Sequence, residues 1–147
     1  MKIFIGADHN GFDYKQKLSQ LLARSGHEVV DEGGKSLSPE DDYPQFAGRV
    51  VTAMLGDKDD VRGILICASG QGMCMAANRF KGIRAALCLS ADEARAARND
   101  DDANVLCLSA IYTNLDDAEN ITNVFLSTPF AGATRFIRRL RELDRLG

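Results

Sequence analysis

Apolar residues along the chain follow two alternating patterns. Short strand-like runs occur at 2–6, 27–31, 61–67, 82–89 and 104–109, and the longer of them suit strands buried in a parallel sheet. Between the runs, residues 12–25, 42–56, 73–80, 91–98, 115–127 and 134–146 have the spacing or end signals of helices. Strands that alternate with helices predict an α/β fold, with a parallel sheet covered by helices on both faces. No linker or repeat divides the chain, so we expect a single domain over residues 1–147.

Several helix boundaries carry recognisable signals. Asp42 can cap a helix whose first turn holds Pro44, and Ser90 can cap the helix that follows it. Ser25 and Gly26 end the first helix. These positions support the predicted alternation of strands and helices.

Composition and charge narrow the class of protein. The net charge of −3 gives no sign of binding to nucleic acid or a membrane surface. No apolar run approaches the ~20 residues of a membrane span, and the apolar start at 1–6 is too short and too early for a signal peptide. The four cysteines form no CxxC pair, so we expect free thiols in a reducing cytoplasm and neither disulfide nor metal site.

The segment 63–78 carries the clearest chemical signal. A buried strand ends at Cys67, passes through the small residues 68–72 and enters a helical pattern at Met73. Such a turn directs several backbone N–H groups at one point and so favours an anion, and a thiol beside them can be held partly as thiolate. A base next to an anion hole suits proton abstraction beside a carbonyl. The alternative is a buried structural cysteine before an ordinary turn.

Polar residues also follow the first strand. Asp8, His9 and Asn10 would lie beyond its carboxyl end, where ligands bind in parallel sheets, and His9 could contact a phosphate or a hydroxyl. The alternative is a turn in which Asp8 or Asn10 caps the next helix. The glycine spacing is not that of a dinucleotide-binding motif.

The last helix is strongly basic. Arg135 and Arg139 are four residues apart, so they share a face and could clamp one phosphate. The alternative is a solvated face on which Glu142 and Asp144 pair with arginines.

Six segments together resemble the ribose-5-phosphate isomerase B and galactose-6-phosphate isomerase family. They are GADHNG (6–11), DYP (42–44), GILICASGQG (63–72), AANR (76–79), GIRA (82–85) and NVL (104–106), in the family's order and spacing. The resemblance implies a Rossmann-like three-layer α/β/α sandwich with a five-stranded parallel sheet and a C-terminal helix packed on a partner subunit. It also implies a homodimer or homotetramer with shared active sites, and no cofactor.

The resemblance further assigns roles to individual residues. Cys67 would move a proton between C1 and C2 of a sugar phosphate through a cis-enediolate, with Ser69 beside it. Asp8 and Tyr43 would line the sugar, and His9 would lie near the phosphate. The enediolate oxygen would be held by backbone amides among Gly70, Gln71, Gly72 and Met73. The phosphate, on the neighbouring subunit's substrate, would be bound by Arg135 and Arg139.

The chain departs from the family at several positions. Asp100, with Asp101 beside it as a further substrate contact, stands where the family usually has a ring-opening histidine. Other usual residues, a glycine, an arginine and a histidine, are replaced by Ala68, Ile111 and Phe136. The substrate could be a tetrose 4-phosphate, which forms no ring, or Asp100 or Asp8 could do the proton work.

A third explanation for the missing ring-opening histidine is that the chain is one subunit of a heteromer, as in galactose-6-phosphate isomerase. The default prediction is interconversion of ribose 5-phosphate and ribulose 5-phosphate. The alternative outside the enzymes is a protein that binds sugar phosphates without catalysing a reaction.

Overall fold

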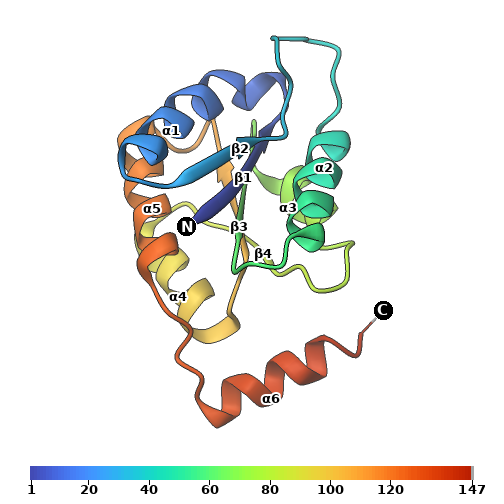
Figure 1. Cartoon of the computed structure of the whole chain (residues 1–147), viewed down its shortest axis with the longest axis vertical. Helices are drawn as coiled ribbons and strands as arrows, with labels where there is room; N and C mark the ends of the chain where they lie inside the picture. The colour runs from blue at the N-terminus through green and yellow to red at the C-terminus, as the bar shows by residue number, and fades with distance from the viewer. Residues whose placement is uncertain (147) are drawn as a thin grey trace.

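The computed structural model describes residues 1–146 and contains five strands and six α-helices (Figure 1). The strands are β1 (Lys2–Ala7), β2 (Glu28–Asp31), β3 (Arg62–Cys67), β4 (Ala85–Leu87) and β5 (Val105–Ser109). The helices are α1 (Phe12–Arg24), α2 (Tyr43–Gly56), α3 (Gln71–Ala77), α4 (Ala91–Asp101), α5 (Leu115–Ser127) and α6 (Thr134–Leu143). A short 3₁₀ turn, η1 (His9–Gly11), joins β1 to α1.

The five strands form one parallel sheet in the order β2-β1-β3-β5-β4. Ala7 of β1 pairs with Ile66 of β3, and Cys67 of β3 pairs with Ser109 of β5. The carboxyl ends of the three central strands therefore meet at one edge of the sheet, as the alternating pattern predicts.

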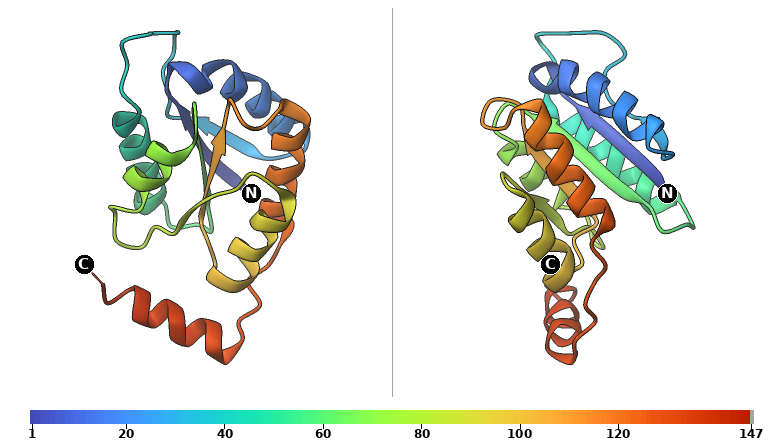
Figure 2. Two further views of the ribbon diagram at one scale, coloured as in Figure 1. Left: turned by 180° about the vertical axis from the view of Figure 1, so that it is seen from behind. Right: turned by 90° about the vertical axis from the view of Figure 1, so that its left-hand side faces the viewer.

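Two apolar clusters cover the two faces of the sheet. Helices α1, α4 and α5 pack on one face through residues such as Leu18, Ala94 and Phe125. Helices α2 and α3 pack on the other through residues such as Val50 and Met73. Figures 1 and 2 show the resulting three layers, which confirm the Rossmann-like α/β/α sandwich.

Helix α6 lies outside these layers. It stands apart from the rest of the chain, beyond the amino ends of the strands and next to the end of α4 (Figures 1 and 2). Within α6, Phe136 is buried, whereas Leu143 is exposed.

Some element bounds differ from the sequence prediction. Strand β4 begins three residues later than predicted and covers only three residues. Gly82 is left-handed (φ 87°), and Asn104 binds the backbone of Gly82 and Arg84 before the strand, while Asn78 binds that of Ala85, its first residue. Helix α3 begins earlier and ends earlier than 73–80, since Gly70 turns the chain into it with φ 78°. Ser90 makes the predicted cap, whereas the side chain of Asp42 makes no capping hydrogen bond.

The four cysteines are free thiols. Cys67, Cys88 and Cys107 are buried, and Cys74 is half-buried. Among residues 1–146, none of the helices combines the length and the apolar character that crossing a membrane requires.

Candidate active site

Three polar or reactive side chains lie in a row at the carboxyl edge of the sheet. Cys67 is the last residue of β3 and pairs with Ser109 on one side. On its other side lies β1, in which Ala7 pairs with Ile66 of β3. Asp8, the next residue after Ala7, is therefore level with Cys67, the next residue after Ile66. Neighbouring strands are about 4.8 Å apart, so the row is compact.

The Cys67 thiol is held by the turn that follows it. The backbone N–H of Gly70 donates to Cys67 Sγ at 3.2 Å, a contact that stabilises negative charge on sulfur. Gly70 has φ 78°, and a Cβ there would lie 2.4 Å from Leu87 Cδ1. Only glycine satisfies both conditions, so this residue fixes the amide against the thiol.

Two amides at the start of α3 are left for a ligand. The Gln71 N–H donates to Ser69 Oγ at 3.3 Å, and the Gly70 N–H is bonded to Cys67. Within residues 1–146, the N–H groups of Gly72 and Met73 have no acceptor. The predicted anion site is therefore reduced from four amides to these two.

Tyr43 lies against the same turn. A Cβ on Gly72 would be 2.7–2.9 Å from atoms of the Tyr43 ring, so the ring packs directly on the glycine. Tyr43 is the first residue of α2 and is partly exposed, which leaves its other side toward solvent. The structure thus places the Tyr43 ring against the turn that carries the amide donors.

Asp8 is buried and caps the turn that follows β1. Its Oδ1 accepts from Asn10 N at 3.0 Å and from Gly11 N at 3.2 Å. The capping alternative is therefore confirmed. Asp8 Oδ2 accepts no hydrogen bond from the described residues, so one oxygen of the same carboxylate is available to a ligand.

His9 is oriented by a residue that sequence reasoning missed. Asp41 Oδ1 accepts from His9 N at 2.9 Å and from His9 Nδ1 at 2.8 Å. The hydrogen bond to Asp41, aided by the negative charge of Asp8, raises the pKa of His9. The imidazole is thus biased toward its cationic form. Its Nε2 lies 3.0 Å from the side-chain amide of Asn10, whose oxygen can accept from Nε2–H when the amide is turned over.

A buried lysine anchors the loop that carries Asp41. Lys15 Nζ donates to Asp31 Oδ2 at 2.6 Å and to the Gly34 carbonyl at 2.9 Å. The lysine is completely buried, so its charge must be compensated by these oxygens. Loop 33–41 is thereby tied to α1 at its start and to His9 at its end.

Cys74 lies on α3, and its surroundings favour the thiolate form over the thiol. Hydrogen bonds from Cys107 and from Asn78 Nδ2, at 3.6 Å, outweigh its burial and lower the pKa of Cys74 to about 7. Burial raises the pKa of Cys88 to about 12, and that of Cys107 is raised as well. Cys74 is therefore the most easily ionised of these three thiols.

We predict that iodoacetamide at pH 7 alkylates Cys74 at least about tenfold faster than Cys88 or Cys107, because about half of Cys74 is thiolate there. Peptide mass spectrometry over a time course measures the three rates. The rate at Cys74 should fall as the pH drops below 7, and Cys74→Ser should remove the fast phase. Faster labelling of Cys88 would contradict the assignment.

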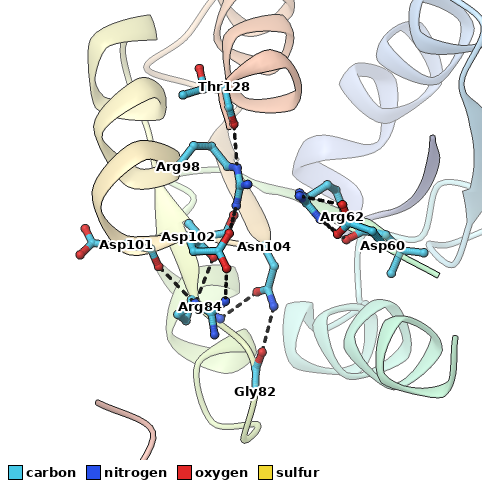
Figure 3. Close-up of polar contacts among 11 residues, drawn as sticks. Asp60, Arg62, Gly82, Arg84, Arg98, Asp101, Asp102, Asn104 and Thr128 are labelled. Carbon is cyan, nitrogen blue, oxygen red and sulfur yellow. Dashed lines mark hydrogen bonds and ion pairs between the residues drawn. The ribbon is translucent and has the colours of Figure 1, made fainter. Parts of the chain in front are cut away.

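The remaining predicted residues lie at the opposite edge of the sheet. Asp100 and Asp101 end α4, and the Asp101 carbonyl accepts from Arg84 Nε at 3.1 Å, just before β4 begins (Figure 3). Strand β3 separates this edge from Cys67 by about 16 Å. Asp100 accepts from Asn99 Nδ2 at 2.7 Å and does not join Cys67 within the chain.

Arg135 and Arg139 share a face of α6, as their spacing predicts. Both guanidinium groups lie over the Phe136 ring, 4.3 Å and 5.9 Å from its centre. Within residues 1–146 the arginines of α6 form no ion pair, so the expected pairing with Glu142 and Asp144 is absent. Phe136 holds the two cations together at the end of the molecule away from Cys67.

No three His, Cys, Asp or Glu side chains in the described part of the chain cluster so that they could hold a metal ion. The residues at the carboxyl edge offer a thiol, a carboxylate oxygen, an imidazole and two amides. Such a set can move a proton and stabilise an oxyanion.

Comparisons with known proteins agree with this geometry. A family model described as Ribose/Galactose Isomerase matches residues 3–143. The probable ribose-5-phosphate isomerase B of Mycoplasma genitalium is 42% identical over 146 residues, which cover 98% of this chain and 92% of that protein. The ribose-5-phosphate isomerase B of Escherichia coli is 39% identical over 131 residues, 89% of this chain and 87% of that one.

Solved structures of related proteins also resemble this chain in both sequence and fold. A ribose 5-phosphate isomerase from Thermotoga maritima has a TM-score of 0.93 and 45% identity, and the match covers 99% of this chain and 98% of that one. Ribose-5-phosphate isomerase B from Mycoplasma genitalium with bound ribulose-5-phosphate has a TM-score of 0.94 and 41% identity, over 98% and 94% of the chains. By fold and site, this protein is an α/β enzyme of the isomerase class. It belongs to the ribose/galactose isomerase family.

Proposed function

We propose that the chain interconverts ribose 5-phosphate and ribulose 5-phosphate. The observation that carries the proposal is the Cys67 thiol, placed beside Asp8 and next to the unbonded amides of Gly72 and Met73. The names of the relatives at 39–42% identity support this pair of substrates, as does the bound ligand of the Mycoplasma genitalium enzyme.

In the proposed mechanism, the Cys67 thiolate removes the proton from C2 of the open-chain aldose. The C2–H electron pair forms the C1–C2 double bond, and the carbonyl electrons move to O1. The amides of Gly72 and Met73 donate to the resulting enediolate oxygen, which they can reach without rearrangement. The thiol then returns the proton to C1, and the carbonyl forms at C2.

The isomerisation also moves a proton from O2 to O1. Asp8 Oδ2 is the unbonded carboxylate oxygen nearest in register to Cys67, and it suits this transfer. Ser69, whose Oγ accepts from the Gln71 amide, can donate its hydroxyl proton to the same oxygens. Tyr43 would close the site over the sugar.

The phosphate is proposed to be bound by Arg135 and Arg139 of a second copy of the chain. These arginines lie at the far edge of the sheet, about 16 Å from the Cys67 edge, so one chain alone does not complete the site. A twofold dimer would bring each α6 to the other copy's strand ends. Asp100 and Asp101 would arrive with it and supply the acid for ring opening.

The proposed phosphate contact of His9 predicts a pH dependence of KM. Asp41 raises the pKa of His9, so its positive charge persists above pH 6.5 and is lost as the pH rises through the folded-state pKa. KM should therefore rise over that interval. In Asp41→Asn the rise should begin at lower pH, because the pKa of His9 falls back toward 6.5.

The control for this pair is Asp42→Asn, since the side chain of Asp42 makes no capping bond. Steady-state kinetics from pH 5.5 to 9 would measure KM for each protein. An identical KM profile in Asp41→Asn and the parent protein would contradict a charged His9 at the phosphate.

Exchange of the C2 proton in deuterated buffer, followed by NMR, tests the substrate. The panel consists of ribose 5-phosphate, a tetrose 4-phosphate and galactose 6-phosphate. Fastest exchange with ribose 5-phosphate is expected. A preference for the tetrose or the hexose would replace the proposed substrate, and no exchange with any sugar would favour a heteromer or a binding protein.

A further inference from the structure

Arg98 is a buried arginine outside the proposed catalytic groups, and only 4% of it is exposed. It belongs to α4, on which Ala94 is also buried and Arg95 is exposed. A buried charge persists only when it is fully hydrogen-bonded, so its partners indicate what it holds in place. The three hydrogen-bond partners come from two separate segments.

The first partners are at the end of α4 itself. Arg98 Nη1 donates to Asp102 Oδ1 at 2.8 Å and to the Ala103 carbonyl at 2.5 Å. Asp102 has a left-handed backbone (φ 46°), and its other oxygen accepts from Arg84 Nη2 at 2.9 Å (Figure 3). This arrangement fixes the residues immediately before it, Asp100 and Asp101.

The other partner starts the C-terminal arm, defined here as the connector 128–133 together with α6. Arg98 Nε donates to the Thr128 carbonyl at 3.3 Å, where the chain leaves α5 (Figure 3). Three residues further along the same connector, Ala131 N donates to the Asn99 carbonyl at 3.1 Å. The guanidinium also lies 5.8 Å from the centre of the Phe125 ring in α5.

We infer that Arg98 is a positioning residue that joins the acidic end of α4 and the C-terminal arm into one rigid unit. The inference rests on the proposed function, in which both segments serve the other subunit's substrate. Asp100 and Asp101 are carried by the α4 end, and Arg135 and Arg139 by the arm. One guanidinium then sets the position of the ring-opening acid relative to the phosphate clamp.

The test is Arg98→Lys, which keeps the charge and the apolar stem but cannot reach all three carbonyl and carboxylate partners. We expect KM for ribose 5-phosphate and the inhibition constant of inorganic phosphate to rise roughly tenfold, because misplacing a binding group by ~1 Å costs up to ~100-fold. kcat should change less than KM. Arg95→Lys is the matched control, since Arg95 is on the same helix and pairs with Asp92 in solvent.

Repeating Arg98→Lys in an Arg135→Ala/Arg139→Ala background distinguishes an effect of Arg98 through the arm from a general structural role. If Arg98 acts through the arm, the added substitution raises KM no further there. An equal KM increase in both backgrounds, or no increase in either, would overturn the inference. Amide hydrogen exchange at Ala131 should also become faster in Arg98→Lys, and unchanged exchange would contradict the anchoring.

A second variant tests the inference if Arg98→Lys folds poorly. Asp102→Asn keeps a residue that tolerates the left-handed backbone and removes the charge that holds Arg98 and Arg84. It should raise KM in the same direction. If the proposed phosphate site is wrong, Arg135→Ala/Arg139→Ala will leave KM unchanged. If that double variant raises KM but neither Arg98→Lys nor Asp102→Asn does, the proposed function stands and only the inference about Arg98 is rejected.

Discussion

Cys67→Ala is expected to lower kcat for ribose 5-phosphate about 10³-fold, which corresponds to about 4 kcal/mol of activation free energy, the middle of the range for a general base. Exchange of the C2 proton with solvent should disappear together with turnover. KM should stay close to that of the parent protein, because the thiol acts on the reacting carbon and does not hold the phosphate. Direct assay and NMR exchange measure both effects.

Cys88→Ala is the matched control for this variant. Cys88 is also a buried thiol, but its pKa is raised to about 12 and it follows the edge strand β4 rather than β3. This substitution should leave kcat within about threefold of the parent. If Cys67→Ala retained more than a tenth of the parent's C2 exchange, another group would have to be the base.

Mixing two impaired variants should restore about a quarter of the parent activity if the site is shared in a twofold dimer and the assay uses substrate well below the raised KM of the arginine variant. One variant is Cys67→Ala, and the other is Arg135→Ala/Arg139→Ala. In a mixed dimer, one site takes Cys67 from one chain and the arginines from the other, so it is intact. Random reassociation makes about half of the dimers mixed, and each has one intact site of two.

The expectation follows from the separation of the two sets within a chain. Cys67 ends β3 at one edge, and α6 lies beyond the amino ends of the strands (Figure 1). The activity of unfolded and co-refolded mixtures, against each variant refolded alone, gives the measurement. If thiol and arginines of one chain served the same site, every site would keep one defect and mixing would restore nothing.

The arrangement around Cys67 was predictable because its causes are local. A buried strand, a left-handed glycine and a helix start follow one another within 63–77, so the N–H contact with the thiol depends on adjacent residues. The same holds for the turn after β1, where Asp8 bonds amides two and three residues away. Such short-range contacts are encoded by residue type and spacing.

Asp41 could not be identified in this way. It lies 32 residues from His9 in an irregular, largely exposed loop, next to two other acidic residues. Its contact depends on Lys15, which anchors the loop from α1. Nothing in the periodicity of the chain distinguishes Asp41 from its neighbours Glu40 and Asp42.

The sequence by itself determined the alternation of strands and helices, the family and the thiol at the end of β3. The predicted parallel sheet also implies that Asp100 and Asp101, just before the last strand, lie at the opposite edge from Cys67. The reason is that α4 runs back from the carboxyl end of β4 to the amino end of β5, which carries its last residues a full strand length away. Tertiary structure alone decided that α6, with Arg135 and Arg139, lies beyond the same edge. The helix follows an irregular connector, and the course of that connector depends on contacts with α4: Arg98 Nε donates to the Thr128 carbonyl, and Ala131 N donates to the Asn99 carbonyl.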